Sequence, residues 1–127
     1  MSIAQFKSDT DVLADGADGL LSRCDKAVAE ADKLLTTAKG AVRVKLQATE
    51  DQAEIQHSMH GLAWLATTVE GLRQMQTWGT NLKTEDRFGE FEQLLLAAAF
   101  AEYLAQISGG CPMSQGEMIR PSALGIP

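Results

Sequence analysis

The amino-acid sequence predicts an all-α protein, an antiparallel up-down bundle of three long helices with a short fourth helix. Apolar residues recur every three or four positions along three long segments, which is the period of helices with one buried face. Two of the three prolines fall in the last seven residues, so the rest of the 127-residue chain is free to be helical. Matched lengths and short connections favour antiparallel neighbours. We therefore expect one domain over residues 1–121.

The first helix is expected over about residues 11–46. Gly16 and Gly19 each cost about 1 kcal/mol in a helix interior, so the regular helix is expected to begin near Asp18. Its apolar residues alternate at spacings of four and three, which is the seam of a helix that packs on other helices. This seam comprises Leu13, Ala17, Leu20, Cys24, Ala27, Ala31, Leu34 and Ala38.

The second helix is expected over about residues 50–79. Thr49 and Gln52 have the spacing of a capping box, in which each side chain satisfies a free backbone donor at the start of a helix. Apolar residues cover more than half of the circumference of this helix. It is therefore expected to be the central helix of the bundle, or to carry an interface.

The third helix is expected over about residues 85–108, with Thr84 as N-cap and a glycine pair at its end. Its main apolar stripe comprises Phe88, Phe91, Leu95, Ala98 and Ala99, and this stripe is expected to face the core. A second capping-box pattern, from Ser114 to Glu117, predicts a short fourth helix over residues 115–120. Residues 122–127 are interpreted as the start of a linker.

Composition excludes several classes of function. The chain has 11 Lys and Arg against 17 Asp and Glu, a formal net charge of −6, so a nucleic-acid partner is not expected. The longest apolar stretch, Leu94 to Ala101, is far shorter than the roughly 20 residues that span a bilayer, so no membrane association is expected. We expect a cytoplasmic protein.

The sequence indicates no catalytic, cofactor-binding or metal-binding residues. Glu54 and His57 have the Glu-x-x-His spacing of di-iron bundles, but such a site needs a second motif of this kind and the chain has none. The acidic residues around Gly16 do not fit a calcium loop, because Leu13 and Ser22 fall at ligand positions. Phosphate-binding loops and nucleophile elbows are absent from the sequence.

Two charged residues continue apolar stripes and therefore need partners. Glu102 extends the stripe of the third helix, and Arg73 extends a stripe of the second helix. If these helices are antiparallel about a turn at residues 79–84, Glu102 lies opposite His60 or Gly61, and we expect it to contact the second helix near His60. The same register places Arg73 opposite Glu90 or Glu92.

Several aromatic residues are candidates for packing or interface contacts. Trp64, Trp78 and Tyr103 are more often core residues than ligand platforms. Trp78, however, falls near a polar edge with His60 and Gln74, where an exposed indole would mark a contact surface.

The residues from His60 onward resemble a known family. The run from His60 to Met75, which contains Glu70, Arg73 and Gln74, resembles the N-terminal extension of certain bacterial acyl-CoA dehydrogenases. Residues 88–120 continue the likeness, including the run from Glu102 to Ile107 and the segment from Pro112 to Gln115. The resemblance is greatest to the methylsuccinyl-CoA dehydrogenase type of the ethylmalonyl-CoA pathway.

The resemblance implies a parent enzyme that uses FAD to dehydrogenate an acyl-CoA thioester at its α and β carbons. In that family the flavin-binding and catalytic segments lie beyond the extension, so no catalytic glutamate is carried over to this chain. The implied function is a non-catalytic domain that packs on the catalytic domains of the parent or on a second subunit. The alternative is a stand-alone bundle that forms a homodimer or binds a partner helix.

Overall fold

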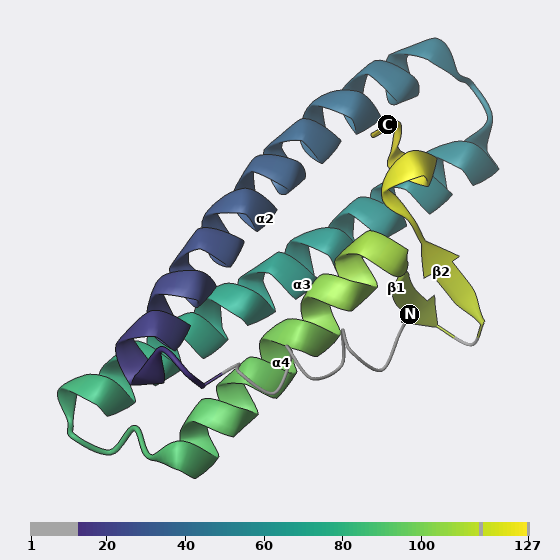
Figure 1. Cartoon of the computed structure of the whole chain (residues 1–127). Helices are drawn as coiled ribbons and strands as arrows, with labels where there is room; N and C mark the ends of the chain where they lie inside the picture. The colour runs from purple at the N-terminus through teal and green to yellow at the C-terminus, as the bar shows by residue number, and fades with distance from the viewer. Residues whose placement is uncertain (1–12, 115, 127) are drawn as a thin grey trace, which may run out of the picture.

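The computed structural model describes residues 13–114 and 116–126, which fold mainly into three long α-helices. These helices are α2 (Gly16–Ala48), α3 (Gln52–Thr84) and α4 (Glu90–Gly109). The chain runs along α2, returns along α3 and turns again into α4 (Figure 1). A hairpin of β1 (Cys111–Ser114) and β2 (Glu117–Ile119) follows, and then the 3-10 helix η2 (Pro121–Leu124). The prediction of a helical bundle is confirmed, with a small sheet added to it.

The helix α2 begins at Gly16, between the predicted bound at residue 11 and the regular start that was predicted near Asp18. Gly16 has a φ of +65°, a left-handed conformation that glycine adopts without steric cost. Its N–H donates to the carbonyl of Leu13, 2.9 Å away, which closes a turn immediately before the helix. Residues 11 and 12 of the prediction lie outside the described residues.

The start of α3 is capped by Asp51 rather than by the predicted Thr49. The Asp51 carboxylate accepts a hydrogen bond from the N–H of Ala53 at 2.9 Å. The Thr49 hydroxyl instead accepts from the N–H of Asp51 and donates to the Glu54 carboxylate. The capping-box interpretation was therefore wrong, although the helix begins within two residues of the predicted position.

The turn between α3 and α4 lies later than predicted. Gly79 does not end α3: a Cβ atom there would lie 2.9 Å from a methyl group of Leu96, so this glycine allows α4 to approach closely. Thr84, the predicted N-cap of the next helix, is the last residue of α3, and its hydroxyl donates to the carbonyl of Thr80. The helix α4 begins five residues later than predicted, at Glu90 after Gly89.

The predicted fourth helix over residues 115–120 is wrong, because residues 117–119 form the second strand of an antiparallel hairpin; residue 115 lies outside the described residues. Cys111 pairs with Ile119, and Pro112 pairs with Met118. Gly116 has a φ of +90° in the connection between the strands, where a residue with a side chain would be strained. The pattern from Ser114 to Glu117 suits a helix start, but here it supplies the hairpin turn.

Residues 121–126 belong to the folded unit, which corrects the prediction of a linker from residue 122. Leu124 is buried, and the Lys45 ammonium group donates to the carbonyl of Ala123 at 3.3 Å. The helix η2 thereby contacts both α2 and α3. Pro127 lies outside the described residues.

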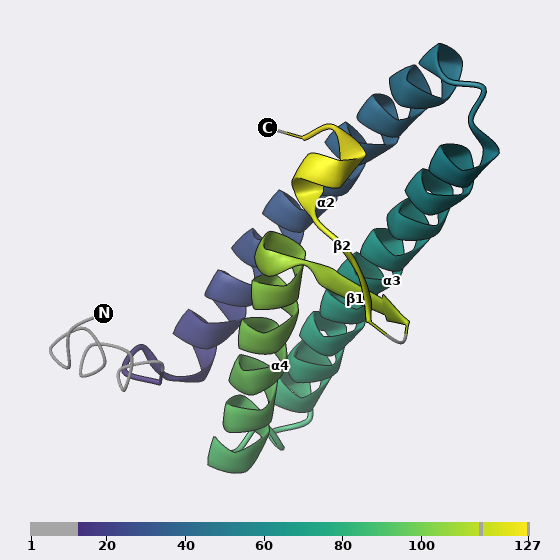
Figure 2. The same cartoon turned by 90° about the vertical axis from the view of Figure 1, so that its right-hand side faces the viewer.

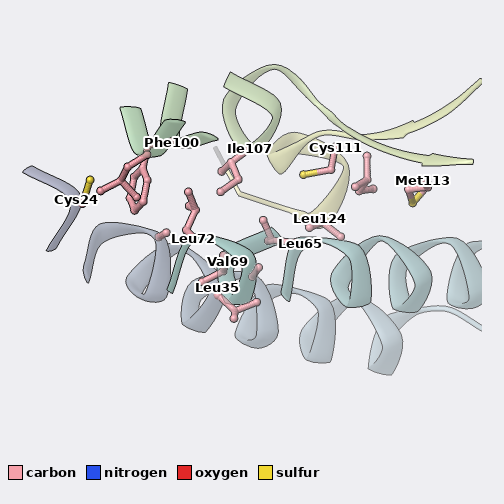
Figure 3. Close-up of a cluster of buried hydrophobic side chains, with 14 of the residues drawn as sticks. Cys24, Leu35, Leu65, Val69, Leu72, Phe100, Ile107, Cys111, Met113 and Leu124 are labelled. Carbon is pink, nitrogen blue, oxygen red and sulfur yellow. The ribbon is translucent and has the colours of Figure 1, made fainter. Parts of the chain in front are cut away.

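The core runs along the interface of the three helices and ends under the hairpin (Figure 3). The helix α4 buries one side against α3 and makes fewer contacts with α2. Burial of a leucine or phenylalanine side chain contributes roughly 1.5–3 kcal/mol, so this continuous cluster accounts for the docking of α4 and the hairpin. Its buried residues include Cys24, Leu35, Leu65, Val69, Leu72, Phe100, Ile107, Cys111, Met113 and Leu124.

Candidate interaction surfaces

The outward side of α4 is an exposed apolar surface, which we call the α4 face. Its large side chains retain much of their exposure: 68% for Phe91, 50% for Leu94 and 44% for Leu95. Figure 2 shows α4 on one side of the α2–α3 pair, and no other described element covers its outer side. The α4 face comprises Phe91, Leu94, Leu95, Ala98, Ala101 and Glu102.

The stripe predicted to face the core is therefore mostly the exposed one. Phe88 is buried as predicted, but Phe91, Leu95 and Ala98 are exposed. Leu96, Phe100 and Ile107 form the buried side of α4 instead. The helix is apolar on almost every side, so its periodicity does not select the side that faces α3.

Glu102 lies on the α4 face, and its predicted contact near His60 is wrong. A Cβ atom at Gly71 would lie 2.9 Å from the Tyr103 ring, so this part of α4 is level with residue 71 of α3. The later start of α4 causes this shift of register. The exposed Glu102 carboxylate accepts a hydrogen bond from the Gln106 amide at 2.8 Å.

The charges on and beside α4 are unevenly distributed. Within the helix the acidic residues are Glu90, Glu92 and Glu102, and Lys and Arg are absent from its sequence. Arg87 lies just before the helix, with 70% of its side chain exposed and an ion pair to Glu85 at 3.1 Å. The end of α4 nearest Arg87 therefore also carries the carboxylates of Glu90 and Glu92, and Glu102 is the acidic residue near the other end.

Arg73 joins α2 to α3, and the predicted pairing with Glu90 or Glu92 is wrong. Its guanidinium group pairs with Asp32 of α2 and with Glu70 of its own helix. Gln74 donates to Glu70 at 2.7 Å. This hydrogen bond and the charge of Arg73 lower the pKa of the Glu70 carboxyl. These residues form a surface network that fixes the two helices relative to each other.

A second surface lies where α3 passes the hairpin, and we call it the hairpin groove. It is an open groove of about 980 Å³, lined by Ala53, Gln56, His57, Met59, His60 and Glu117. The indole N–H of Trp64 donates to Nε2 of His60 at 3.1 Å, and both side chains are exposed. Within the described residues, no group of three or more His, Cys, Asp or Glu residues is placed to hold a metal ion.

The two thiols are buried away from these surfaces. Burial raises the pKa of the Cys24 thiol to about 11, with a further contribution from the neighbouring Asp25. Burial also raises the pKa of Cys111, although the Thr68 hydroxyl, 4.0 Å from its sulfur, partly opposes this. Both thiols are therefore neutral near pH 7 and poor nucleophiles.

The predicted site residues do not converge on one place. His60 and Trp64 lie beside the hairpin groove, Glu70, Arg73 and Gln74 belong to the ion-pair network, and Glu102 lies on the α4 face. Trp78 and Tyr103 are half-buried against the core. The α4 face was missed as a surface, although the apolar run from Leu94 to Ala101 is continuous around the helix and could have indicated it.

Among the described helices, none combines the length and apolarity that a membrane span requires. No family model matches the chain. The chain is 46% identical, in an alignment of 112 residues that covers 84% of the chain, to a protein from Cereibacter sphaeroides named (2S)-methylsuccinyl-CoA dehydrogenase. It spans about 20% of the length of that protein. This similarity confirms the resemblance indicated by the sequence.

Proposed function

Because the chain is related over most of its own length to an acyl-CoA dehydrogenase of the methylsuccinyl-CoA type, we propose that it is a non-catalytic helical domain of such an enzyme. It acts by packing between domains or subunits. The observation that carries this proposal is the α4 face, where three large apolar side chains stand side by side with 44% to 68% of their surface exposed.

The spacing of these side chains supports an interface rather than chance exposure. Single exposed apolar residues such as Val44 are normal on protein surfaces. Phe91, Leu94 and Leu95, by contrast, are three and four residues apart on one helix, so they form one contiguous patch. Contiguous apolar patches on soluble domains mark contact surfaces.

The parent enzyme would use FAD to oxidise an acyl-CoA thioester, and the hairpin groove of this chain does not fit that cofactor. The pyrophosphate of a flavin dinucleotide requires cationic side chains or a cluster of backbone N–H donors. The hairpin groove is lined by the carboxylate of Glu117 and by no Lys or Arg. This groove therefore does not supply a flavin site, which agrees with a packing role for the domain.

The proposal is tested by supplying the chain in trans. The Cereibacter sphaeroides relative is produced without the segment that matches this chain, mixed with the 127-residue chain, and analysed by size exclusion with light scattering. We expect a complex containing both polypeptides. Separate elution of the two at all concentrations would contradict the proposal.

Two matched variants show whether the complex depends on the described surfaces. Leu95→Glu introduces a charge on the α4 face, and Val44→Glu introduces the same charge at a solitary exposed position of α2. If the α4 face contributes to the assembly, Leu95→Glu reduces the size or yield of the complex and Val44→Glu does not. Equal effects of the two variants would count against a role for the α4 face.

A further inference from the structure

We propose that the outer edge of β2 binds an extended segment from the remaining part of the enzyme, which adds to the hairpin as a third strand. This edge, which we call the β2 edge, is formed by the backbone of Met118 and Arg120. The segment carries an apolar side chain beside Met118 and an acidic side chain beside Arg120. The inference rests on the proposed function, because it names a contact by which the domain packs on the rest of the enzyme.

The hairpin has a free edge on its outer strand. Of the two strands, β1 packs against α3 and α4, and β2 is the outer strand (Figure 1). Within residues 13–114 and 116–126, no third strand pairs with β2. An unpaired strand edge presents backbone donors and acceptors with which another extended chain can pair.

The position of Pro112 shows which groups of β2 face outward. Opposed residues of an antiparallel pair alternate between exchanging two N–H···O bonds and exchanging none. Pro112 is paired with Met118 and has no N–H, so this pair exchanges none. The N–H and C=O of Met118 therefore point away from β1, to the β2 edge. Arg120 lies two residues further on with an extended backbone, so its N–H lies on the same edge.

Three backbone groups are thus available to a third strand, namely the N–H and C=O of Met118 and the N–H of Arg120. The carbonyl of Arg120 is already engaged, because it accepts from the N–H of Ala123 at 3.0 Å. Proteins often protect a strand edge with proline or lysine. Pro112 protects the edge of β1 in this way, but β2 contains neither residue. The β2 edge is therefore the edge that is open to pairing.

The side chains at the β2 edge indicate what the added segment carries. Residues two apart in an extended chain point to the same face, so Met118 and Arg120 share one face. The Met118 side chain is 45% exposed, and a flexible thioether adapts to apolar partners of varied shape. Arg120 is exposed and has no ion pair within the described residues. A free guanidinium group favours a carboxylate, so we expect an apolar and an acidic residue two positions apart in the partner.

The surroundings of the β2 edge favour a single strand over a second copy of the chain. The hairpin groove lies between α3 and Glu117, the first residue of β2. A single extended segment on β2 can continue along this groove, whereas a second copy would bring its own helices against α3. The chain spans about 20% of the related dehydrogenase, so most of that enzyme lies outside it and can supply the segment.

A pair of substitutions at Met118 tests the backbone bonds directly. Met118→Pro and Met118→Ala both remove the thioether, but only Met118→Pro removes the outward N–H. This N–H does not bond to β1, so proline is compatible with the hairpin, and circular dichroism checks that both variants are folded. In calorimetric titrations with the truncated relative, we expect Met118→Pro to bind about tenfold more weakly than Met118→Ala. Equal affinities in a complex that forms would overturn the inference and leave the proposed function standing.

A matched pair of charge reversals tests the acidic side chain of the partner. Arg120→Glu places a carboxylate at the β2 edge, and Lys39→Glu makes the same change of charge at an exposed position of α2. We expect Arg120→Glu to weaken the complex about tenfold and Lys39→Glu to leave it nearly unchanged. Equal effects of the two variants would contradict an acidic partner at Arg120.

Amide hydrogen exchange locates the added strand. In the complex, exchange of the Met118 and Arg120 amides is expected to slow at least about tenfold, because both N–H groups become bonded. Unchanged exchange at both amides in a complex that has formed would overturn the inference.

A peptide scan separates the inference from the proposed function. Short overlapping peptides that cover the relative beyond the matched segment are titrated against the 127-residue chain. We expect binding by a peptide with an apolar and an acidic residue two positions apart, and loss of that binding in Met118→Pro. If such a peptide binds but the truncated relative does not, the inference stands and the proposed function fails. If the chain alone forms a dimer that Met118→Pro abolishes, the β2 edge pairs with a second copy and the inference is overturned.

Discussion

Substitution of Gly61 by alanine tests how the hairpin is held on α3. A Cβ atom at Gly61 would lie 2.5 Å from Cγ1 and 2.8 Å from Cδ1 of Ile119, which is itself buried. Gly40, on the exposed side of α2, offers a matched control because a Cβ atom there meets nothing within 4 Å. Both glycines lie inside long helices, so both substitutions gain the same helix propensity, about 1 kcal/mol.

The difference between the two variants isolates the packing cost. Gly40→Ala is expected to raise the free energy of unfolding by about 1 kcal/mol. Gly61→Ala gains the same amount but forces the Ile119 side chain and its strand outward, at a cost of about 1–3 kcal/mol. Gly61→Ala should therefore be the less stable of the two by about 1–3 kcal/mol, or roughly 4 °C in melting temperature per kcal/mol.

Urea unfolding followed by circular dichroism measures both values. A double-mutant cycle adds the rescue: with Ile119→Ala in the background, the side-chain atoms in the way are removed, and Gly61→Ala should cost at least about 1 kcal/mol less. If Gly61→Ala stabilises the chain as much as Gly40→Ala does, the hairpin does not pack on α3 as described.

Three further predictions concern the core, the thiols and the surface network. Leu72→Ala removes a fully buried side chain and should lower the free energy of unfolding by roughly 3–5 kcal/mol in urea titrations, whereas Leu94→Ala at a half-exposed position should change it by less than about 1 kcal/mol. The pKa of Cys24 is about 11 in the folded chain, against an ordinary value of 9.0, so its thiol should resist alkylation at pH 8 until urea unfolds the protein. The stability that the neutral thiol contributes is present below pH 9 and is lost as the pH rises towards 11. The pKa of the Glu70 carboxyl is lowered, so the stability that this carboxylate contributes is present above its ordinary pKa of 4.5 and is lost as the pH falls through the lower value of the folded chain. Glu70→Gln should therefore flatten the acid side of a plot of melting temperature against pH. An unchanged acid side would contradict this.

The existence of the three helices could be predicted from the sequence, because long apolar periodicity is the most reliable local signal. Their ends could not. Thr84 is a residue type that favours helix starts and Gly79 one that favours helix ends, but both lie inside α3. Gly79 serves close packing against Leu96, a tertiary contact that no local pattern contains.

The shift of that turn explains the errors about the candidate site. Moving the start of α4 from residue 85 to Glu90 changes which residues of α3 and α4 are level with each other. Glu102 therefore moves away from His60, and Arg73 finds Asp32 on α2 instead of an acid on α4. The hairpin was missed for a similar reason: the Ser114–Glu117 pattern is shared by helix starts and by turns, and only the left-handed Gly116 distinguishes them.

The family resemblance, unlike the predicted contacts, did not depend on how the helices are aligned with each other. It was based on the order of unusual residues from His60 onward, and a register error in the fold does not affect such an order. It could therefore be confirmed by similarity even where the predicted contacts were wrong. The apolar run of α4 could have indicated an exposed apolar surface, but which side of the helix is free follows only from the packing of its other side against α3.

The central claim is that this chain serves a dehydrogenase through its packing surfaces and not through a reaction centre of its own. An antibody against the 127-residue chain, used to isolate the native protein from cells of its source, tests this directly by mass spectrometry and absorption spectroscopy. We expect its peptides to be recovered with a flavin-containing dehydrogenase, either in one longer polypeptide or in a stable complex. Recovery of a free 13.7 kDa chain with no dehydrogenase attached would contradict the account.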